Sequence, residues 1–215
     1  MSSEREKYVE SWKDPQYRDK SPAEQHMRQL LKIFSPQAGN SLIDWGCGTG
    51  RASYELWQAG LDVTMIDIAY NALDQKVKEA SRGNPRLRFI THDISESIDL
   101  TADYSFCCDV MEHLPPDRVD AALDNIISSS KHTLFVIATF EEALHPELHL
   151  TVRSHRWWLR KISNKPVTVM YSGEYKYYRE DELYEPIYKG SHAVFYLSNS
   201  SYGELGRCQE QQKQA

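Results

Sequence analysis

The segment SLIDWGCGTG, residues 41–50, joins a short apolar run to a cluster of glycines. Glycine at alternate positions, Gly46, Gly48 and Gly50, lets the backbone turn tightly and approach a ligand without a clash at Cβ. The pattern is not a dinucleotide fingerprint, which would require glycine where the chain has Arg51. It also lacks the Gly-Lys-Ser/Thr sequence of a phosphate-binding loop. Taken alone, the segment predicts a tight turn between a strand and a helix, with or without a ligand.

Outward from this segment, short β-branched apolar runs alternate with segments whose apolar residues recur at helical spacing. This alternation is typical of right-handed βαβ units and a parallel sheet with helices on both faces. Ligands of such sheets bind beyond the carboxyl ends of the strands, so the residues after each run matter most. The predicted strands are residues 41–45, 61–67, 87–93, 104–108 and 133–139, and the predicted helices are residues 51–59, 69–80 and one from about residue 116.

The two ends of the chain show other patterns. Residues 1–20 form a polar arm with aromatic side chains among the charges, and Ser21-Pro22-Ala23-Glu24 is a capping box that predicts the start of a helix. The C-terminal third predicts a helix over residues 152–162 and strands over residues 167–171 and 193–197. A tyrosine-rich segment lies between these strands. We interpret it as a β-hairpin arm, with an aromatic lid as the alternative.

Composition excludes several classes of protein. The chain has 215 residues, of which 40% are hydrophobic, so one domain with an ordinary core is expected. Its net charge of −6 argues against a dedicated nucleic-acid binder. The four cysteines form no CxxC pair and no disulfide framework, and no apolar run approaches the ~20 residues that span a bilayer. Together with an N-terminus that lacks an apolar signal segment, these features predict a cytoplasmic protein.

Acidic residues stand at the predicted strand ends. Asp44 precedes the glycine cluster, Asp67 ends the second strand and Asp93 ends the third. A carboxylate at the end of the second strand can accept two hydrogen bonds from ribose hydroxyl groups, although Asp67 is also well placed to cap a helix. The fourth strand is followed by the string DVMEHLPP, residues 109–116.

These four features, in this order and each at a strand end, resemble the class I S-adenosylmethionine-dependent methyltransferases, in particular those of quinone biosynthesis and small-molecule modification. The resemblance covers residues 41–139. It implies a three-layer Rossmann-like α/β sandwich whose seven-stranded sheet is mostly parallel with one antiparallel strand. It also implies S-adenosyl-L-methionine as cofactor and S-adenosyl-L-homocysteine as product. The cofactor-binding residues that it implies are Asp44, Gly46, Cys47, Gly48, Asp67, Ile68, Asp93, Ile94, Asp109 and Val110.

We therefore expect a single methyltransferase domain over residues 1–215. Its expected parts are an N-terminal arm and capped helix (1–40), a cofactor-binding core (41–139), an acceptor-side helix with the last two strands (140–205) and a flexible tail (206–215).

The acceptor is less well defined than the cofactor. The chain lacks the Asn/Asp-Pro-Pro-Tyr/Phe tetrad of base-amino methyltransferases and the Pro-Cys of cytosine-C5 enzymes, so nucleic acid is disfavoured but stays open. A hydroxyl or amine acceptor usually needs a base, for which His113, Glu112 and His149 are the catalytic candidates. A structural histidine that closes the loop is the alternative for His113. His145 and His149 are spaced i,i+4, but HPELH is not HExxH, so we expect no metal and place His145 in the acceptor pocket.

The predicted helix over residues 152–162 has a basic, aromatic face that contains Arg153, Arg156 and Trp157. One hypothesis is that this face binds an anionic acceptor, and the alternative is an ordinary solvated face. We therefore predict O- or N-methylation of a small acceptor, with an anionic one as the finer hypothesis. The alternatives are methylation of nucleic acid or a macromolecular glycan, and a non-catalytic S-adenosylmethionine-binding sensor or partner subunit.

Overall fold

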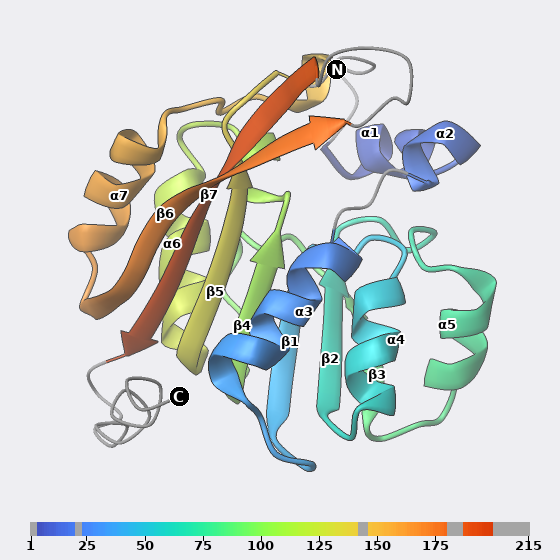
Figure 1. Ribbon diagram of the computed structural model, residues 1–215. Coiled ribbons are helices and arrows are strands. Elements are labelled where there is room, and N and C mark those ends of the chain that lie inside the picture. The colour runs from blue at the N-terminus through green and yellow to red at the C-terminus, as the bar shows by residue number, and fades with distance from the viewer. Residues whose placement is uncertain (1–3, 20–22, 142–145, 180–186, 200–215) are drawn as a thin grey trace.

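The computed structural model describes residues 4–19, 23–141, 146–179 and 187–199, and a seven-stranded sheet forms its centre (Figure 1). In chain order the strands are β1 (Ser41–Trp45), β2 (Asp62–Asp67), β3 (Leu87–Thr91), β4 (Ala102–Cys108), β5 (Ser130–Ala138), β6 (Val167–Arg179) and β7 (Ile187–Asn199). Across the sheet they lie in the order β3-β2-β1-β4-β5-β7-β6. The first five are mutually parallel, and β7 runs antiparallel to both β5 and β6. The predicted sheet with one antiparallel strand is confirmed.

Helices cover both faces of the sheet (Figure 1). One core lies between the sheet and three helices and includes Leu30 and Leu56; the other lies beneath two helices and includes Ile126 and Trp158. These four side chains are fully buried, as expected for a three-layer sandwich. The three helices over the first core are α3 (Ala23–Phe34), α4 (Arg51–Gln58) and α5 (Gln75–Ser81). The two helices over the second core are α6 (Val119–Ser128) and α7 (His155–Ser163).

The helix predicted over residues 69–80 is shorter than expected: α5 begins at Gln75 and covers only the last part of that range. Side chains outside residues 69–80 form hydrogen bonds with backbone groups near the start of the predicted helix. The Ala69 N–H donates to Asp67 Oδ1 at 2.8 Å, and Arg18 Nη2 donates to the Ala72 carbonyl at 2.7 Å. Such side-chain bonds compete with helix formation and leave residues 68–74 as a turn.

The C-terminal hairpin is longer than the two short strands predicted for it. β6 and β7 pair continuously apart from register shifts, so the prediction of a hairpin arm is confirmed. Gly173 suggests a break in the sequence, but it pairs with Val194 inside the ladder. A Cβ on Gly173 would lie 2.3 Å from the Tyr171 hydroxyl, so the glycine makes room for that side chain. Tyr184 lies outside the described residues.

Other predictions from the sequence have mixed outcomes. The helix expected from about residue 116 begins at Val119, after a turn. Cys107 and Cys108 are buried in β4, as expected of core thiols. Ser21 and Pro22 of the capping box, Cys208 and the tail over residues 206–215 lie outside the described residues, and the helix that the capping box predicts is α3, described from Ala23.

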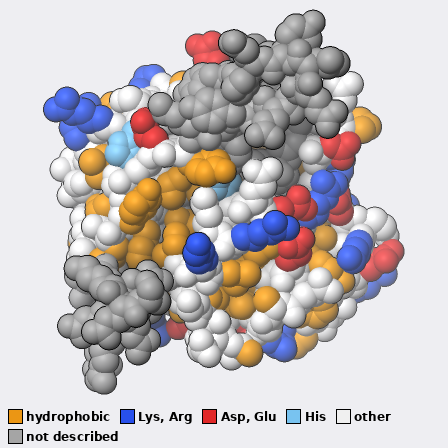
Figure 2. All heavy atoms as spheres, viewed as in Figure 1, with side chains coloured by type: hydrophobic (Ala, Val, Ile, Leu, Met, Phe, Trp, Pro, Cys, Tyr) orange, Lys and Arg blue, Asp and Glu red, His pale blue; other side chains and the backbone are white. Residues whose placement is uncertain are grey.

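Two helices of the N-terminal arm, α1 (Glu4–Ser11) and α2 (Pro15–Arg18), lie beyond the carboxyl ends of the parallel strands (Figure 1). On the face shown in Figure 2, basic and acidic side chains are interspersed rather than gathered into one basic field. No helix among the described residues is both long and apolar enough to cross a bilayer.

Candidate functional site

The carboxyl ends of β1, β2 and β4 meet at one edge of the sheet, where the strand order reverses between β1 and β4. Ligands bind at this switch point in open α/β sheets. The turn after β1 has positive φ at Gly46 (75°) and Gly48 (52°), a conformation that glycine adopts without strain. The N–H groups of Gly46 and Cys47 donate to the Ile66 carbonyl at 2.8 and 2.9 Å, which fixes the turn against β2.

The turn closely approaches the loop after β4. A Cβ on Gly46 would lie 2.3 Å from Cγ2 of Val110, so only glycine fits at this position without a shift. Gly48 lies beneath the ring of Trp12, whose Cη2 would be 2.8 Å from a Cβ on that glycine. The glycines therefore bring the turn, the β4 loop and the N-terminal arm together.

Asp67, at the end of β2, is held by backbone donors. Its carboxylate accepts hydrogen bonds from the N–H of Gly48 at 2.9 Å and of Ala69 at 2.8 Å. Burial raises the pKa of Asp67 to about 6, although these backbone hydrogen bonds act to lower it. Asp67 is therefore fixed in position, and its carboxyl group ionises at a higher pH than an ordinary aspartate does.

Asp44 lies beneath the glycine turn. It is 3% exposed and accepts a hydrogen bond from Ser53 Oγ at 2.6 Å. Burial raises the pKa of Asp44 to about 7, and the Ser53 hydrogen bond acts in the opposite direction.

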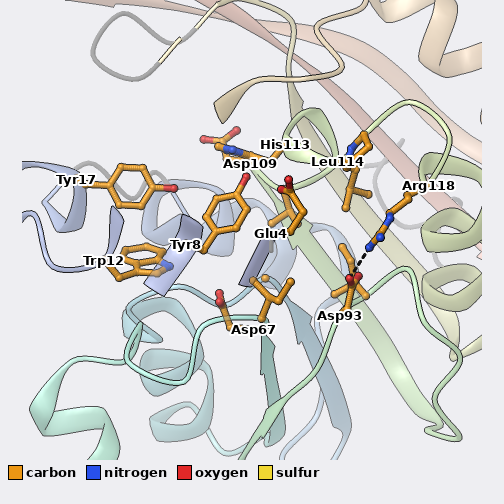
Figure 3. A pocket seen from close by; sticks show the side chains of 15 residues that line it. Glu4, Tyr8, Trp12, Tyr17, Asp67, Asp93, Asp109, His113, Leu114 and Arg118 are labelled. Atoms are coloured by element: carbon orange, nitrogen blue, oxygen red, sulfur yellow. Dashed lines mark hydrogen bonds and ion pairs between the residues drawn. The ribbon is translucent and has the colours of Figure 1, made fainter. Parts of the chain in front are cut away.

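Asp93, beyond β3, is bound by two partners. Ser95 donates to its Oδ1 through both Oγ at 2.7 Å and N–H at 2.9 Å, and Arg118 forms an ion pair with Oδ2 at 2.8 Å (Figure 3). Ile94 follows and is buried. The third strand thus contributes an acid and an apolar surface side by side.

Asp67, Asp93 and Ile94 line one cavity of about 650 Å³, a volume that includes the space at its mouth (Figure 3). Predicted cofactor residues form much of the wall, whereas Asp44, Cys47 and Gly48 lie behind it. The sequence prediction missed Glu4, Tyr8 and Trp12 of the arm, although the aromatic side chains of Tyr8 and Trp12 among the charges were visible in the sequence. The lining residues are Glu4, Tyr8, Trp12, Tyr17, Gly46, Asp67, Ile68, Asp93, Ile94, Asp109, Val110, His113, Leu114, Pro115 and Arg118.

Arg18 anchors the arm over this cavity. It donates to the Ala72 carbonyl at 2.7 Å and forms an ion pair with Asp74 at 2.6 Å. Asn71 adds a hydrogen bond from Nδ2 to the Val9 carbonyl at 2.9 Å. Tyr8 extends from the anchored arm with its ring 5.8 Å from the His113 ring, and its buried hydroxyl has no hydrogen-bond partner among the described residues.

The loop after β4 is strained and rich in titratable groups. Asp109 has φ of 51°, which costs a non-glycine residue about 1–2 kcal/mol, and such strain is typical of functional sites. His192 Nε2 lies 2.7 Å from Asp109 Oδ1. Burial raises the pKa of Asp109, but the interaction with His192 outweighs it, so the pKa is lowered overall.

Two of the three catalytic candidates follow on η1 (Met111–His113), a short 3-10 helix. Burial raises the pKa of Glu112 strongly, and the nearby Asp109 adds to this shift. Burial also lowers the pKa of His113 to about 3, with His149 as the next cause, so His113 is neutral and only weakly basic at neutral pH. The structure brings His149 next to His113, with ring centroids 4.6 Å apart.

The predicted acceptor residues are less concentrated. Arg153 precedes α7, while Arg156 and Trp157 lie on that helix, and none of the three lines the cavity. Arg153 and Arg156 are exposed, whereas Trp157 packs against the core. His145 lies outside the described residues.

Comparison with known proteins agrees with this arrangement. Residues 42–132 match the methyltransferase domain family. Over 91 residues the chain is 28% identical to a ubiquinone biosynthesis O-methyltransferase of Rickettsia bellii, a match covering 42% of this chain and 37% of the relative. It is also 28% identical over 93 residues to the chloroplastic magnesium protoporphyrin IX methyltransferase of Arabidopsis thaliana. This match covers 42% of this chain and 30% of the relative. The chain thus matches about a third of these relatives' length.

Solved structures share the whole fold. The 1,6-didemethyltoxoflavin-N1-methyltransferase of Burkholderia thailandensis, solved with S-adenosylhomocysteine, has a TM-score of 0.69 at 17% identity and covers 91% of this chain and 86% of its own. The N-methyltransferase NodS of Bradyrhizobium japonicum WM9 has a TM-score of 0.68 at 17% identity, covering 92% and 100%. Residues 42–132 thus match a methyltransferase domain, and the sheet that contains them has the fold of the class I S-adenosylmethionine-dependent methyltransferases.

Proposed function

We propose that this chain catalyses methyl transfer from S-adenosylmethionine to a small-molecule acceptor, as an O- or N-methyltransferase. The observation that carries this proposal is a cavity at the carboxyl ends of the strands, lined by Asp67, Gly46 of the glycine turn and apolar side chains. S-adenosylmethionine supplies a methyl group already activated on a sulfonium. The protein therefore has mainly to bind and align the reactants, which can contribute several kcal/mol, up to about 10 in favourable cases.

The lining suits this cofactor chemically. The fixed carboxylate of Asp67 can accept hydrogen bonds from both ribose hydroxyl groups. Ile68 and Ile94 offer apolar surface for an adenine ring, with Asp93 beside them for its amino group. Gly46 lines the cavity next to Val110, where its backbone can meet the methionine end. An acidic wall also complements a cationic sulfonium.

The size of the acceptor follows from what encloses the cavity. Glu4, Tyr8 and Trp12 of the arm form one wall, and Arg18 fixes the arm to the body of the protein. The cavity, whose volume of about 650 Å³ includes open space at its mouth, must contain the cofactor as well as the acceptor. The wall that the anchored arm forms supports a small molecule over a nucleic-acid duplex or a glycan chain.

On the acceptor side, His113 is the catalytic candidate that lines the cavity, with Glu112 and His149 behind it. Its imidazole is neutral at neutral pH, so its lone pair can accept a hydrogen bond from a hydroxyl or amine acceptor, but its lowered pKa of about 3 makes it a weak base. We propose that these three residues act on the acceptor rather than on the cofactor.

A tritium-labelled methyl group on S-adenosylmethionine tests the proposal directly. Incubation with separate panels of phenols, amines, nucleotides and sugar phosphates should label at least one small molecule. Label appearing only in tRNA or a polysaccharide would replace the small acceptor with a macromolecule. Cofactor binding without any transfer would instead support a non-catalytic sensor.

An anionic acceptor is the finer proposal, supported by the exposed cations at the start of α7. Replacing Arg153, Arg156 and Arg160 together with glutamine should raise the KM of an anionic acceptor. The Kd of S-adenosylhomocysteine should stay the same, because none of the three lines the cavity. An unchanged KM would remove the anionic proposal and leave methyl transfer intact.

A further inference from the structure

We propose that Glu112, His113 and His149 form a binding site for a divalent transition-metal ion beside the cavity. One ligand atom from each residue lies within 4.8 Å of the others. Two imidazoles and one carboxylate are a ligand set for Zn²⁺, Co²⁺, Mn²⁺ or Fe²⁺ that leaves coordination positions open. This inference departs from the expectation of no metal, which considered His145 and His149 along the sequence rather than the three residues in space.

The strongest support is the state of Glu112. Its side chain is fully buried, and neither carboxylate oxygen has a hydrogen-bond partner among the described residues. The Asp109 side chain and the backbone amides of Glu112 and Ala138 are the polar groups nearest to the Glu112 carboxyl group, and none of them meets the geometric criteria for a hydrogen bond with it. A buried carboxyl group in this position favours its protonated form, and coordination of a cation would replace that proton and stabilise the carboxylate.

The two histidines also have nitrogen atoms available. His113 Nδ1 is buried and has no hydrogen-bond partner in the described part of the chain. His149 Nδ1 lies 2.8 Å from the Phe140 carbonyl oxygen. Because a carbonyl only accepts, Nδ1 carries the proton, and the lone pair of His149 is therefore on Nε2. Metal-binding histidines are commonly oriented by such a hydrogen bond from the other ring nitrogen.

The backbone holds the ligands together before any ion arrives. The Thr151 N–H donates to the Glu112 carbonyl at 2.8 Å, and Thr151 Oγ1 donates to the Leu114 carbonyl at 2.6 Å. These bonds fix the segment containing His149 against η1. The site is therefore preorganised by two segments that are distant in the sequence.

The position of the site suggests its use, which rests on the proposed function. His113 lines the cavity beside Asp109, above Tyr8 (Figure 3). A cation there would face the acceptor, and coordination of an acceptor hydroxyl would lower its pKa, so that its proton would be lost to solvent before the oxygen takes the methyl group. The three residues would then serve as ligands in place of a general base, and oxygen acceptors would be favoured over amines.

Co²⁺ is the probe for the test, because its visible absorption reports coordination without any enzyme assay. After treatment with a chelator, the full chain is titrated with CoCl₂, and the bound metal is measured after dialysis. We expect one Co²⁺ per chain with visible absorption. In separate Glu112→Gln and His149→Gln variants the affinity should fall by at least about tenfold. His92→Gln is the control, since His92 lies away from the site with Nε2 near the Glu96 carbonyl, and it should bind as the wild type does.

Absence of Co²⁺ binding, or equal binding by all four proteins, would overturn the proposal. Circular dichroism checks folding, and His149→Gln decides alone if Glu112→Gln fails to fold. The same samples are titrated with S-adenosylhomocysteine. Binding of this nucleoside without Co²⁺ would remove the metal site alone, whereas Co²⁺ binding without the nucleoside would leave the metal site and contradict the proposed function.

Discussion

The contact between the glycine turn and the β4 loop leads to a quantitative prediction for Gly46→Ala. The new Cβ has two costs. A positive φ of 75° costs an L-residue about 1–2 kcal/mol, partly offset by about 0.4–1 kcal/mol because alanine restricts the unfolded chain. The methyl group would also lie 2.3 Å from Cγ2 and 2.8 Å from Cγ1 of Val110, and overpacking of this kind costs about 1–3 kcal/mol.

Gly83→Ala separates these two costs. Gly83 has a similar φ of 70°, but nothing lies within 4 Å of its missing Cβ. We expect Gly83→Ala to lower the free energy of unfolding by no more than about 1 kcal/mol and Gly46→Ala by about 2–4 kcal/mol. Gly46→Ala should also weaken S-adenosylhomocysteine binding, since both Gly46 and Val110 line the cavity.

Urea unfolding of four proteins measures the difference: wild type, Gly46→Ala, Val110→Ala and the double variant. Truncating Val110 removes both close atoms and leaves its Cβ at 3.1 Å. The double variant should therefore be more stable than the sum of the single changes predicts, with a coupling of about 1–2 kcal/mol. Strict additivity, or equal loss in Gly46→Ala and Gly83→Ala, would refute the reasoning.

Three further predictions concern charged groups around the cavity. Burial raises the pKa of Asp67 to about 6, and the ribose hydroxyl groups need the ionised carboxylate as acceptor. By calorimetry, S-adenosylhomocysteine should therefore bind about tenfold more weakly at pH 5 than at pH 7. Asp67→Asn should abolish this dependence of the affinity on pH. Arg18→Ala should weaken the same binding about two- to tenfold, since the arm must then become ordered on binding, while Arg5→Ala on the exposed side of α1 should not. The pKa of Asp44 is raised to about 7 in the folded protein, above its unfolded value of 3.8, so the wild type loses stability as the pH rises between these two values. In urea unfolding, the stability of Asp44→Asn relative to wild type should therefore increase over this range, by up to about 1.4 kcal/mol per pH unit. A difference that does not change with pH would contradict this.

The strand-end residues could be predicted from the sequence because each signal is local. Asp67 follows an apolar run directly, Gly46 belongs to a turn pattern, and Ile94 follows the third strand. A parallel sheet then brings such residues to one edge whatever the details of packing.

The remaining site residues depend on contacts between distant segments. Tyr8 and Trp12 reach the cavity because Arg18 binds the turn at residues 68–74, a contact that no periodic pattern encodes. The same contact shortened the predicted helix there. Glu112 and His149 were predicted as catalytic candidates, but they meet because of the loop that Thr151 fixes, so their spacing in the sequence did not indicate a shared metal site.

The central claim is that the cavity binds the nucleoside part of S-adenosylmethionine through Asp67. Calorimetric titration with S-adenosylhomocysteine tests it most directly, using wild type, Asp67→Ala and the control Asp62→Ala at the opposite end of β2. We predict micromolar binding with one site per chain for wild type and for Asp62→Ala, and none for a folded Asp67→Ala. Absence of binding by the wild type, or unchanged binding by Asp67→Ala, would contradict it.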